Sequence, residues 1–368
     1  WWSCWPSCLL GQAGWRQKRH EKILARLISK WPYLIMAVLL IVLILLPFDW
    51  FPGKYTTLMI FIGISTMVTV GLCLLMGYTG QVSLGQAAFF GCGAYISGVF
   101  SKYYSVNPWL AMLIAAAVTG VFAYVIGYPI LRLRGNYLAL ATLAIGVIVW
   151  IILRNEGPGG PDGFSGIPAL SIGGFAFNTS FKRYFLVWGF CLATLFISQN
   201  IVRSRSGRAL RAIHGSEAAA ESIGINVAQF KVKIFVLSAV YASLAGSLFA
   251  HHLRHISPQT FDAMASVKLV VMAVIGGLAS VWGAIFGAGT TRLLSDEILV
   301  RYHVLSGWDI PIYGLILVLV MIFMPQGLFV ALRSASYWLR YNWRELPSIT
   351  KGIYERKVLR LRSGGDQS

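Results

Sequence analysis

The sequence has few charged residues, and those that it has are unevenly distributed. Only 12% of its 368 residues are Asp, Glu, Lys or Arg, whereas a soluble globular domain carries about 25%. A helix that crosses a bilayer needs about 20 mostly apolar residues. Seven windows of that length or more contain no charged residue: 55–101, 103–131, 135–153, 184–202, 234–253, 269–291 and 310–332. Such solid apolar runs exclude a membrane barrel, whose strands alternate in segments of about ten residues.

Motifs for nucleotide binding and catalysis are also missing. The sequence contains no G-x-x-x-x-G-K-[ST], no nucleophile elbow and no H-E-x-x-H, so we expect neither an ATP site nor an enzymatic reaction, and no cofactor. His251, His252 and His255 lie together but have no acidic or cysteine partner nearby in sequence, so we expect no metal site. Residues 1–15 lack the basic and apolar regions of a signal peptide and are left out of the functional interpretation.

The net charge of +18 comes from 31 basic and 13 acidic residues. The basic residues flank the apolar windows instead of lining one face, so they indicate cytoplasmic loops and not nucleic-acid binding. Six Lys or Arg residues lie in 1–32, six in 203–233 and eight in 333–368. Because cytoplasmic segments of membrane proteins are enriched in Lys and Arg, both termini and the central loop are predicted to be cytoplasmic.

Because these three basic segments are predicted to be cytoplasmic, they determine how the chain is divided into membrane spans. The segment 163–181 is rich in Gly, Pro and Ser and is predicted to be an external loop, since a crossing there would place the basic loop outside. The region 261–298 must cross twice, with a break at Gly276-Gly277, if the basic tail is to lie inside. The predicted spans are 33–51, 56–76, 83–100, 109–131, 136–153, 184–202, 233–252, 261–277, 280–298 and 311–331. The predicted fold is therefore all-α, a polytopic transmembrane bundle of about ten helices over 33–332, between basic cytoplasmic segments 1–32 and 333–368.

The cytoplasmic loop 203–230 contains a short predicted helix over 217–223. Ser216 is a good N-cap, Glu217 suits the positive helix end, and Gly224 is placed to end the helix in a left-handed conformation. The helix would be roughly 10 Å long. A short, rigid, capped helix on the cytoplasmic face is suited to dock in a cleft of another protein.

This loop resembles the EAA loop of ABC importer permeases, E-A-A-x-x-x-G, which contacts the ATP-hydrolysing subunit. Ala219, Ala220 and Gly224 match the pattern, while Glu217 stands one position before the family's glutamate. Two roles for Glu217 stay open: pairing with a basic residue of the ATPase, or complementing the helix dipole. The resemblance implies that the coupling residues are Glu217, Ala219, Ala220, Glu221 and Gly224.

Further segments resemble the M-type permease subunit of branched-chain amino-acid ABC transporters. They are GYTGQVSLGQAAFFGCGAY at 77–95, LRGNYLALATL at 133–143, GGPDGFSGIP at 159–168 and MAVIGGLASVWGA at 272–284, the last with Ala279 where the family has glycine. The resemblance covers roughly 30–335 and implies the ABC importer permease fold. It also implies a second, H-type permease, two ATP-binding subunits, and a periplasmic protein that delivers leucine, isoleucine or valine at the bacterial inner membrane.

Two alternatives from the same sequence remain open. One is a urea or amide permease of the same superfamily, against which the 159–168 loop argues. The other is an ion-coupled secondary transporter, which would need intramembrane carboxylates that the predicted spans almost lack.

Several polar residues in or beside the predicted spans are candidates for the translocation path. In hydrocarbon an unsatisfied polar group costs several kcal/mol, so these side chains should face the protein interior or water. They would bind the two ends of a zwitterion or hold helices together. Lys268 is either functional or extends to the membrane interface. The candidates are Gln81, Ser83, Gln86, Asn136, Tyr137 and Thr142.

Overall fold

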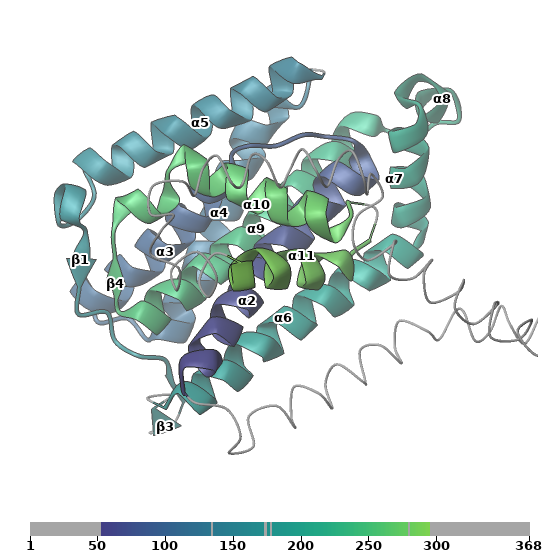
Figure 1. The fold of residues 1–368 in the computed structure, drawn as a ribbon. Helices are drawn as coiled ribbons and strands as arrows, with labels where there is room; N and C mark the ends of the chain where they lie inside the picture. The colour runs from purple at the N-terminus through teal and green to yellow at the C-terminus, as the bar shows by residue number, and fades with distance from the viewer. Residues whose placement is uncertain (1–52, 134, 173–174, 177–178, 279, 295–368) are drawn as a thin grey trace, which may run out of the picture. The chain divides into compact units, whose positions relative to one another are not determined.

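The computed structural model describes residues 53–133, 135–172, 175–176, 179–278 and 280–294, which form ten α-helices (Figure 1). The predicted spans 33–51 and 311–331 and the basic segments 1–32 and 333–368 lie outside these residues. The α-helices are α2 (Gly53–Leu72), α3 (Gln86–Tyr103), α4 (Pro108–Ile130), α5 (Asn136–Asn155), α6 (Ser180–Arg203), α7 (Arg205–Gly215), α8 (Glu217–Ser222), α9 (Val227–Leu253), α10 (Ala263–Gly276) and α11 (Gly283–Arg292). The prediction of an all-α bundle is confirmed.

Among the described residues, five helical segments are long and apolar enough to cross a membrane. They are Tyr55–Gly77, which joins α2 to the π-helical turn η1 (Cys73–Gly77), and helices α4, α5, α6 and α9. Each coincides with a predicted span. Helix α9 begins at Val227, six residues before the predicted start at 233, because Lys231 is accommodated inside the helix by an ion pair described below.

The predicted span 83–100 corresponds to α3, whose first residue is Gln86. Residues 80–85 are not helical and form a loop ahead of it, in which Gln81, Ser83 and Gly85 are buried. Helix α3 packs closely on α9, since a Cβ at Gly93 would collide with the backbone of Ser243, and one at Gly246 with the carbonyl of Phe90. Small residues allow this approach between membrane helices.

The long helices differ in how much of each is buried, and this distinguishes central from peripheral helices. The apolar window of Tyr55–Gly77 is 89% buried and that of α9 is 72% buried, whereas only 22% of the α5 window is buried. Helix α5 exposes Leu140, Ile148 and Ile152. Apolar side chains on such a face match lipid tails or another membrane subunit.

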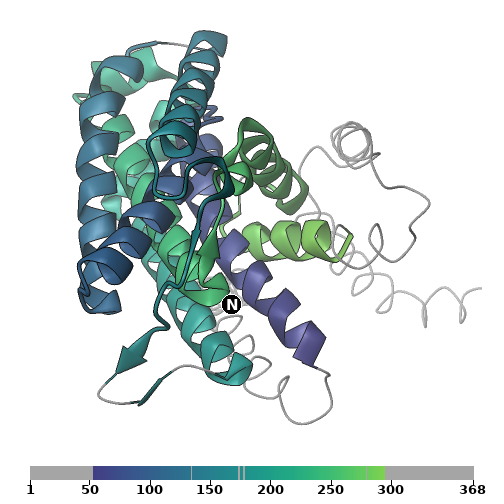
Figure 2. The same ribbon diagram turned by 90° about the vertical axis from the view of Figure 1, so that its left-hand side faces the viewer.

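The break predicted at Gly276-Gly277 is present, because α10 ends at Gly276 and Gly277 has a φ of +101°. Helix α10 has 14 residues and α11 has 10, so α10 is roughly 21 Å long and α11 roughly 15 Å. Helix α10 is therefore shorter than the roughly 30 Å hydrocarbon core of a bilayer, whereas α11 continues into π-helical residues 293–294, where the described segment ends. The hairpin they form lies beside α2, on the same side of the bundle (Figure 2), and Arg292 donates a hydrogen bond to Ser65.

The predicted external loop contains short regular elements that its composition did not indicate. A 3-10 turn, η2 (Gly160–Asp162), is closed by a hydrogen bond from the Gly163 amide to the Gly160 carbonyl at 3.1 Å. Strand β1 (Phe164–Ser165) then pairs antiparallel with β4 (His255–Ile256), directly after α9. Strands β2 (Ser171–Ile172) and β3 (Phe175–Ala176) form a second small ladder, and the 3-10 turn η3 (Pro258–Phe261) leads into α10. The loop is thus fixed to the end of α9.

Candidate functional site

The loop 80–85 and the start of α3 hold a buried polar cluster. Gln81, Ser83 and Gln86 are each at most 3% exposed. The Gln86 Nε2 atom donates to Ser238 Oγ on α9 at 2.8 Å. Within the described residues, both amide atoms of Gln81, the Ser83 hydroxyl and Gln86 Oε1 make no side-chain hydrogen bond. Buried polar atoms are usually satisfied, so this cluster is suited to water or a polar solute.

The other three predicted path residues divide between the interior and the surface. Thr142 is buried, and its hydroxyl accepts from the Leu84 amide at 3.0 Å and donates to the Ala139 carbonyl. It therefore fixes the 80–85 loop to α5. Asn136 and Tyr137, at the start of α5, are exposed, Tyr137 by 75%, so the structure does not bring them into the cluster.

Two serines that the sequence reasoning missed complete this cluster. Ser238 of α9 is the partner of Gln86, and Ser266 Oγ of α10 accepts from the Ala87 amide at 3.0 Å. An early amide of α3, which has no partner within its own helix, is satisfied in this way. The available signal was a serine inside an apolar window. Serines are frequent in membrane helices, so this signal does not distinguish a site residue from any other.

The predicted cytoplasmic helix is present as α8, one residue shorter than predicted. Ser216 Oγ accepts from the Ala219 amide at 3.3 Å. Gly224 has a φ of +82°, its amide donates to Glu221, and the Ile225 amide donates to Ala220. These two bonds form a Schellman motif, which satisfies the last carbonyls of the helix.

Helix α8 is held by a small apolar core and preceded by α7, which the sequence analysis did not predict. The core consists of Ile213, Ala220 and Val227, with Ala212, Ile225 and Phe230 packed against it. Of the predicted coupling residues, Ala220 therefore faces inward, whereas Ala219, Glu221 and Gly224 are exposed. Ile223, at the helix end, is 72% exposed. An exposed apolar side chain on a rigid turn is suited to a partner's pocket.

Glu217 pairs within its own chain. Its Oε1 lies 2.6 Å from Lys231 Nζ on α9, and the lysine side chain is only 7% exposed, against 34% for the glutamate. The sequence analysis had considered a partner on the ATPase or a helix-dipole role, and it missed this pair. The available signal was a lysine at the edge of an apolar run, which needs a counter-charge when it is buried.

The cytoplasmic helices touch the polar loop. Gly80 has a φ of +71°, and a Cβ built there would lie 3.2 Å from Nδ1 of His214 on α7. Burial raises the pKa of the neighbouring Tyr78 to about 12, so its phenol stays neutral. Because Gly80 lies against His214, the loop that carries Gln81 rests directly on α7.

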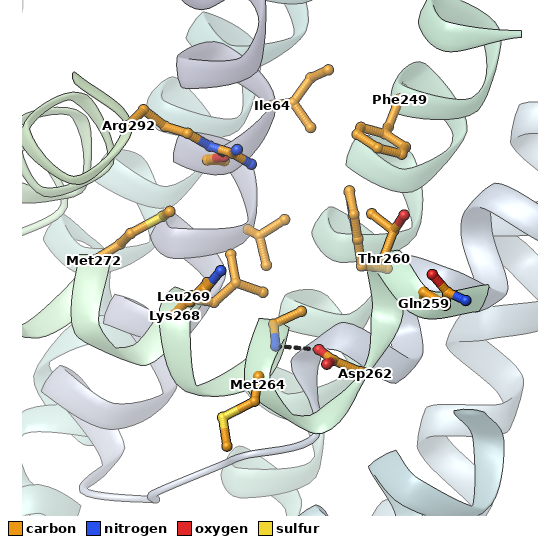
Figure 3. A pocket seen from close by; sticks show the side chains of 14 residues that line it. Ile64, Phe249, Gln259, Thr260, Asp262, Met264, Lys268, Leu269, Met272 and Arg292 are labelled. Atoms are coloured by element: carbon orange, nitrogen blue, oxygen red, sulfur yellow. Dashed lines mark hydrogen bonds between the residues drawn. The ribbon is translucent and has the colours of Figure 1, made fainter. Parts of the chain in front are cut away.

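A cavity of about 300 Å³ lies between α2, α3, α9, η3, α10 and α11 (Figure 3). Lys268 and Arg292 point into it, and Asp262 lies at its edge. Of the two interpretations of Lys268, the structure favours the cavity over extension to the interface. Arg292 was not predicted, although an arginine at the end of an apolar window was visible in the sequence. The rest of the lining is mostly apolar: Ile64, Val68, Phe90, Phe249, Met264, Ala265, Leu269 and Met272, with Ser65, Gln259 and Thr260.

His251 has a structural partner on each side of its ring. His251 Nε2 lies 2.8 Å from Ser97 Oγ, and its Nδ1 lies 2.8 Å from the Pro168 carbonyl. A carbonyl only accepts, so Nδ1 carries the proton and Nε2 accepts from the serine hydroxyl. In the part of the chain that the structure describes, no three His, Cys, Asp or Glu residues converge as a metal site would require.

Comparisons with known proteins agree on one family. The family described as "Branched-chain amino acid transport system / permease component" matches residues 55–325. The chain is 31% identical to the high-affinity branched-chain amino acid transport system permease protein LivM of Salmonella typhimurium over 80% of its length and 74% of that protein. It is also 31% identical to LivM of Escherichia coli K12, over 70% of this chain and 66% of the relative, just under two thirds.

More distant similarities extend to a second group of permeases. The probable branched-chain amino acid transport permease protein LivH of Methanocaldococcus jannaschii is 23% identical over 73% of this chain and 89% of the relative. A solved structure, PsaBC from Streptococcus pneumoniae in complex with Fab, aligns with a TM-score of 0.42 at 14% identity, over 77% of this chain and 96% of that one.

Proposed function

The chain belongs to the branched-chain amino acid transport permease family and is a multi-pass membrane protein, and on that premise we propose that it is the M-type permease subunit of an ABC importer. The importer would move leucine, isoleucine or valine inward, using ATP hydrolysed by partner subunits. Its relatives are transport permeases and not enzymes. The chain would supply half of the path and no catalytic group.

The observation that carries this proposal is that α8 is fixed at both ends and along its inner face. Its N-terminus is capped by Ser216, its C-terminus by the Gly224 turn, and its inner face by the Ala220 core. A helix held in this way moves as one body with α7 and the start of α9. Force applied by an ATPase at Ile223 would then reach Gly80, because that loop rests on His214 of α7.

The remaining partners follow from the surfaces and the family. LivH-type relatives support a second permease, which the exposed apolar side chains of α5 would contact. Two ATP-binding subunits would dock on the cytoplasmic loop 203–230. A periplasmic binding protein would dock on the external segment around η2, where Asp162 is exposed.

The proposed orientation places both termini in the cytoplasm of a bacterium with the chain in the inner membrane. The basic segments 1–32, 203–233 and 333–368 support this assignment. The polar cluster at Gln81 would then lie near the cytoplasmic side of the path, and β1 with β4 near the periplasmic side.

Co-expression with the partner subunits tests the proposal. We expect the ATP-binding subunits to co-purify with this chain, and labelled leucine to accumulate only when the binding protein and ATP are present. Labelled urea and acetamide serve as the comparison, since a urea or amide permease would accumulate them instead. Accumulation driven by an ion gradient without ATP would contradict the proposal.

A further inference from the structure

The cavity beside α10 combines charges of both signs with an apolar wall (Figure 3). Lys268 and Arg292 reach in from two different helices, and Asp262 stands at the start of α10. Charged side chains are costly within membrane segments and usually mark a substrate or ion path. A ligand in this cavity would therefore meet charged side chains of both signs.

Arg292, on the positively charged side of the cavity, is held in place by neighbouring groups. Arg292 Nε donates to Ser65 Oγ of α2 at 3.1 Å, and its guanidinium lies 5.6 Å from the centre of the Phe61 ring. This anchors the side chain while its charge faces the cavity. Lys268 contributes a second cation from α10. A carboxylate accepts well from such a pair, because charge-assisted hydrogen bonds are the stronger kind.

The negative side is provided by Asp262. Its Oδ1 accepts from the Ala265 amide at 2.7 Å and caps α10. An ionised carboxylate has about four lone-pair positions, so the cap leaves room for a donor from a ligand. Lys268 follows six residues later, roughly 9 Å along the helix axis. Asp262 and Lys268 thus line the same cavity from different turns of α10.

The remaining wall is suited to a branched aliphatic group. Ile64, Val68 and Leu269 supply aliphatic contacts, and Phe90 and Phe249 supply aromatic ones. A volume of about 300 Å³ is at the lower end for ligand pockets, which favours a small molecule.

We propose that this cavity binds a zwitterionic α-amino acid with an apolar side chain, its carboxylate at Lys268 and Arg292 and its ammonium at Asp262. The inference rests on the proposed transport function and adds the residues that would recognise the substrate inside the membrane. Neutral urea or a simple amide has no ionic group to pair with the three charges.

Uptake by the complete transporter gives the first test. Asp262→Asn keeps the helix cap, since Asn caps as well as Asp, but removes the charge. We expect Asp262→Asn and Lys268→Met each to lower leucine uptake by about tenfold or more, as for the loss of a charged hydrogen bond. Lys268→Arg should retain most of it. Arg154→Gln is the matched control, because it removes a positive charge that lies over Trp150 on α5, outside the cavity. ATPase co-purification should be unchanged in all four.

Thermal stabilisation of the purified complex gives the second test, with leucine and two analogues that each lack one charged end. Isocaproate has no ammonium and isoamylamine has no carboxylate. Leucine should raise the melting temperature of the wild-type complex more than either analogue, because a ligand stabilises the state that it binds. Asp262→Asn should make leucine and isocaproate equal, and Lys268→Met should make leucine and isoamylamine equal.

The outcomes separate this inference from the transport proposal. If the wild type takes up leucine and both charge-removing variants do so equally well, the cavity is not the substrate site and the inference is overturned. Equal stabilisation of the wild type by all three compounds would overturn it as well. If the wild type takes up no leucine, the transport proposal fails, while the loss of leucine preference in Asp262→Asn would still support the cavity.

Discussion

Glu217 and Lys231 form a 2.6 Å ion pair that joins the first turn of α8 to the first turns of α9. The lysine side chain is 7% exposed, so its charge depends on this partner. The glutamate, which the family pattern places one position later, therefore pairs with a lysine of its own chain. In the proposed complex, an ATPase would therefore contact the exposed residues of α8 and its C-terminal turn, such as Ile223.

Removal of one member of this pair should cost more than removal of both. Glu217→Ala leaves Lys231 buried without its counter-charge, and we expect a loss of about 1–3 kcal/mol of stability. The double variant Glu217→Ala/Lys231→Met should recover most of it. Thermal unfolding of the purified complex measures both, with the exposed Glu221→Ala as the control on the same helix. Additive losses would show that the pair does not couple.

Gly224 should tolerate only residues that accept a left-handed backbone. Gly224→Val is β-branched and resists the observed φ of +82°, so the Schellman turn would be distorted and ATPase co-purification and leucine uptake should fall sharply. Gly224→Asn should retain both, because Asn adopts this conformation more readily. Membrane insertion should be normal in both. Normal transport by Gly224→Val would show that this loop does not couple the ATPase.

Single cysteines test the proposed orientation. The five native cysteines are first replaced, and a cysteine is then placed at Ser165 or Ser206, both of which are exposed in the structure. A membrane-impermeant thiol reagent added to spheroplasts should label Ser165→Cys and spare Ser206→Cys until the membrane is opened. Ser348→Cys, outside the described residues, should behave like Ser206→Cys. Labelling of Ser348→Cys in sealed cells would contradict the ten-span arrangement.

The external segment is better tested by substitution than by deletion. A deletion of 157–163 would remove Gly163, where a Cβ would collide with the Ile256 carbonyl, and so disturb the pairing of β1 with β4. Asp162→Arg instead reverses one exposed charge on η2. If a binding protein docks there, uptake should fall while ATPase co-purification persists. Unchanged uptake across a range of binding-protein concentrations would argue against docking at this turn.

His251 should be important for stability and His255 should not. His251→Leu removes both of its hydrogen bonds and leaves Ser97 and the Pro168 carbonyl without this partner. Each buried group left unpaired costs about 1–3 kcal/mol. We expect the melting temperature to drop for His251→Leu and to stay unchanged for the exposed His255→Leu. Equal effects would show that the tether between α3 and the external segment contributes little.

The sequence was sufficient for features that depend on local pattern. Apolar windows predicted five of the long helices, and the Ser216 and Gly224 signals predicted α8 within one residue. The pairing of Lys231 with Glu217 was not predictable, because it depends on how α8 folds back on α9. Lys231 counts in the sequence only as one of the six basic residues of 203–233, so the predicted span begins at 233, six residues after the start of α9.

The residues that line the candidate cavity were also only partly predictable, because the cavity depends on tertiary packing. Lys268 stood out as a charge in a span, whereas Arg292 and Asp262 looked like ordinary residues at segment ends. Only the packing of α10 and α11 against α2 brings Lys268 and Arg292 to one cavity. Asn136 and Tyr137, which the sequence also offered for the path, are exposed at the start of α5, and their place in the path stays a prediction.

The contact between Gly80 and His214 restricts which sequences can adopt this fold. Position 80 needs a residue without a side chain, both for its φ of +71° and for the ring that lies against it. A Cβ at position 80 would press on the exposed His214 ring and displace it by a few tenths of an ångström, even though 134 residues separate the two positions along the chain. The left-handed backbone disfavours other residues at position 80 whatever side chain stands at 214, so relatives should keep the glycine even where position 214 varies.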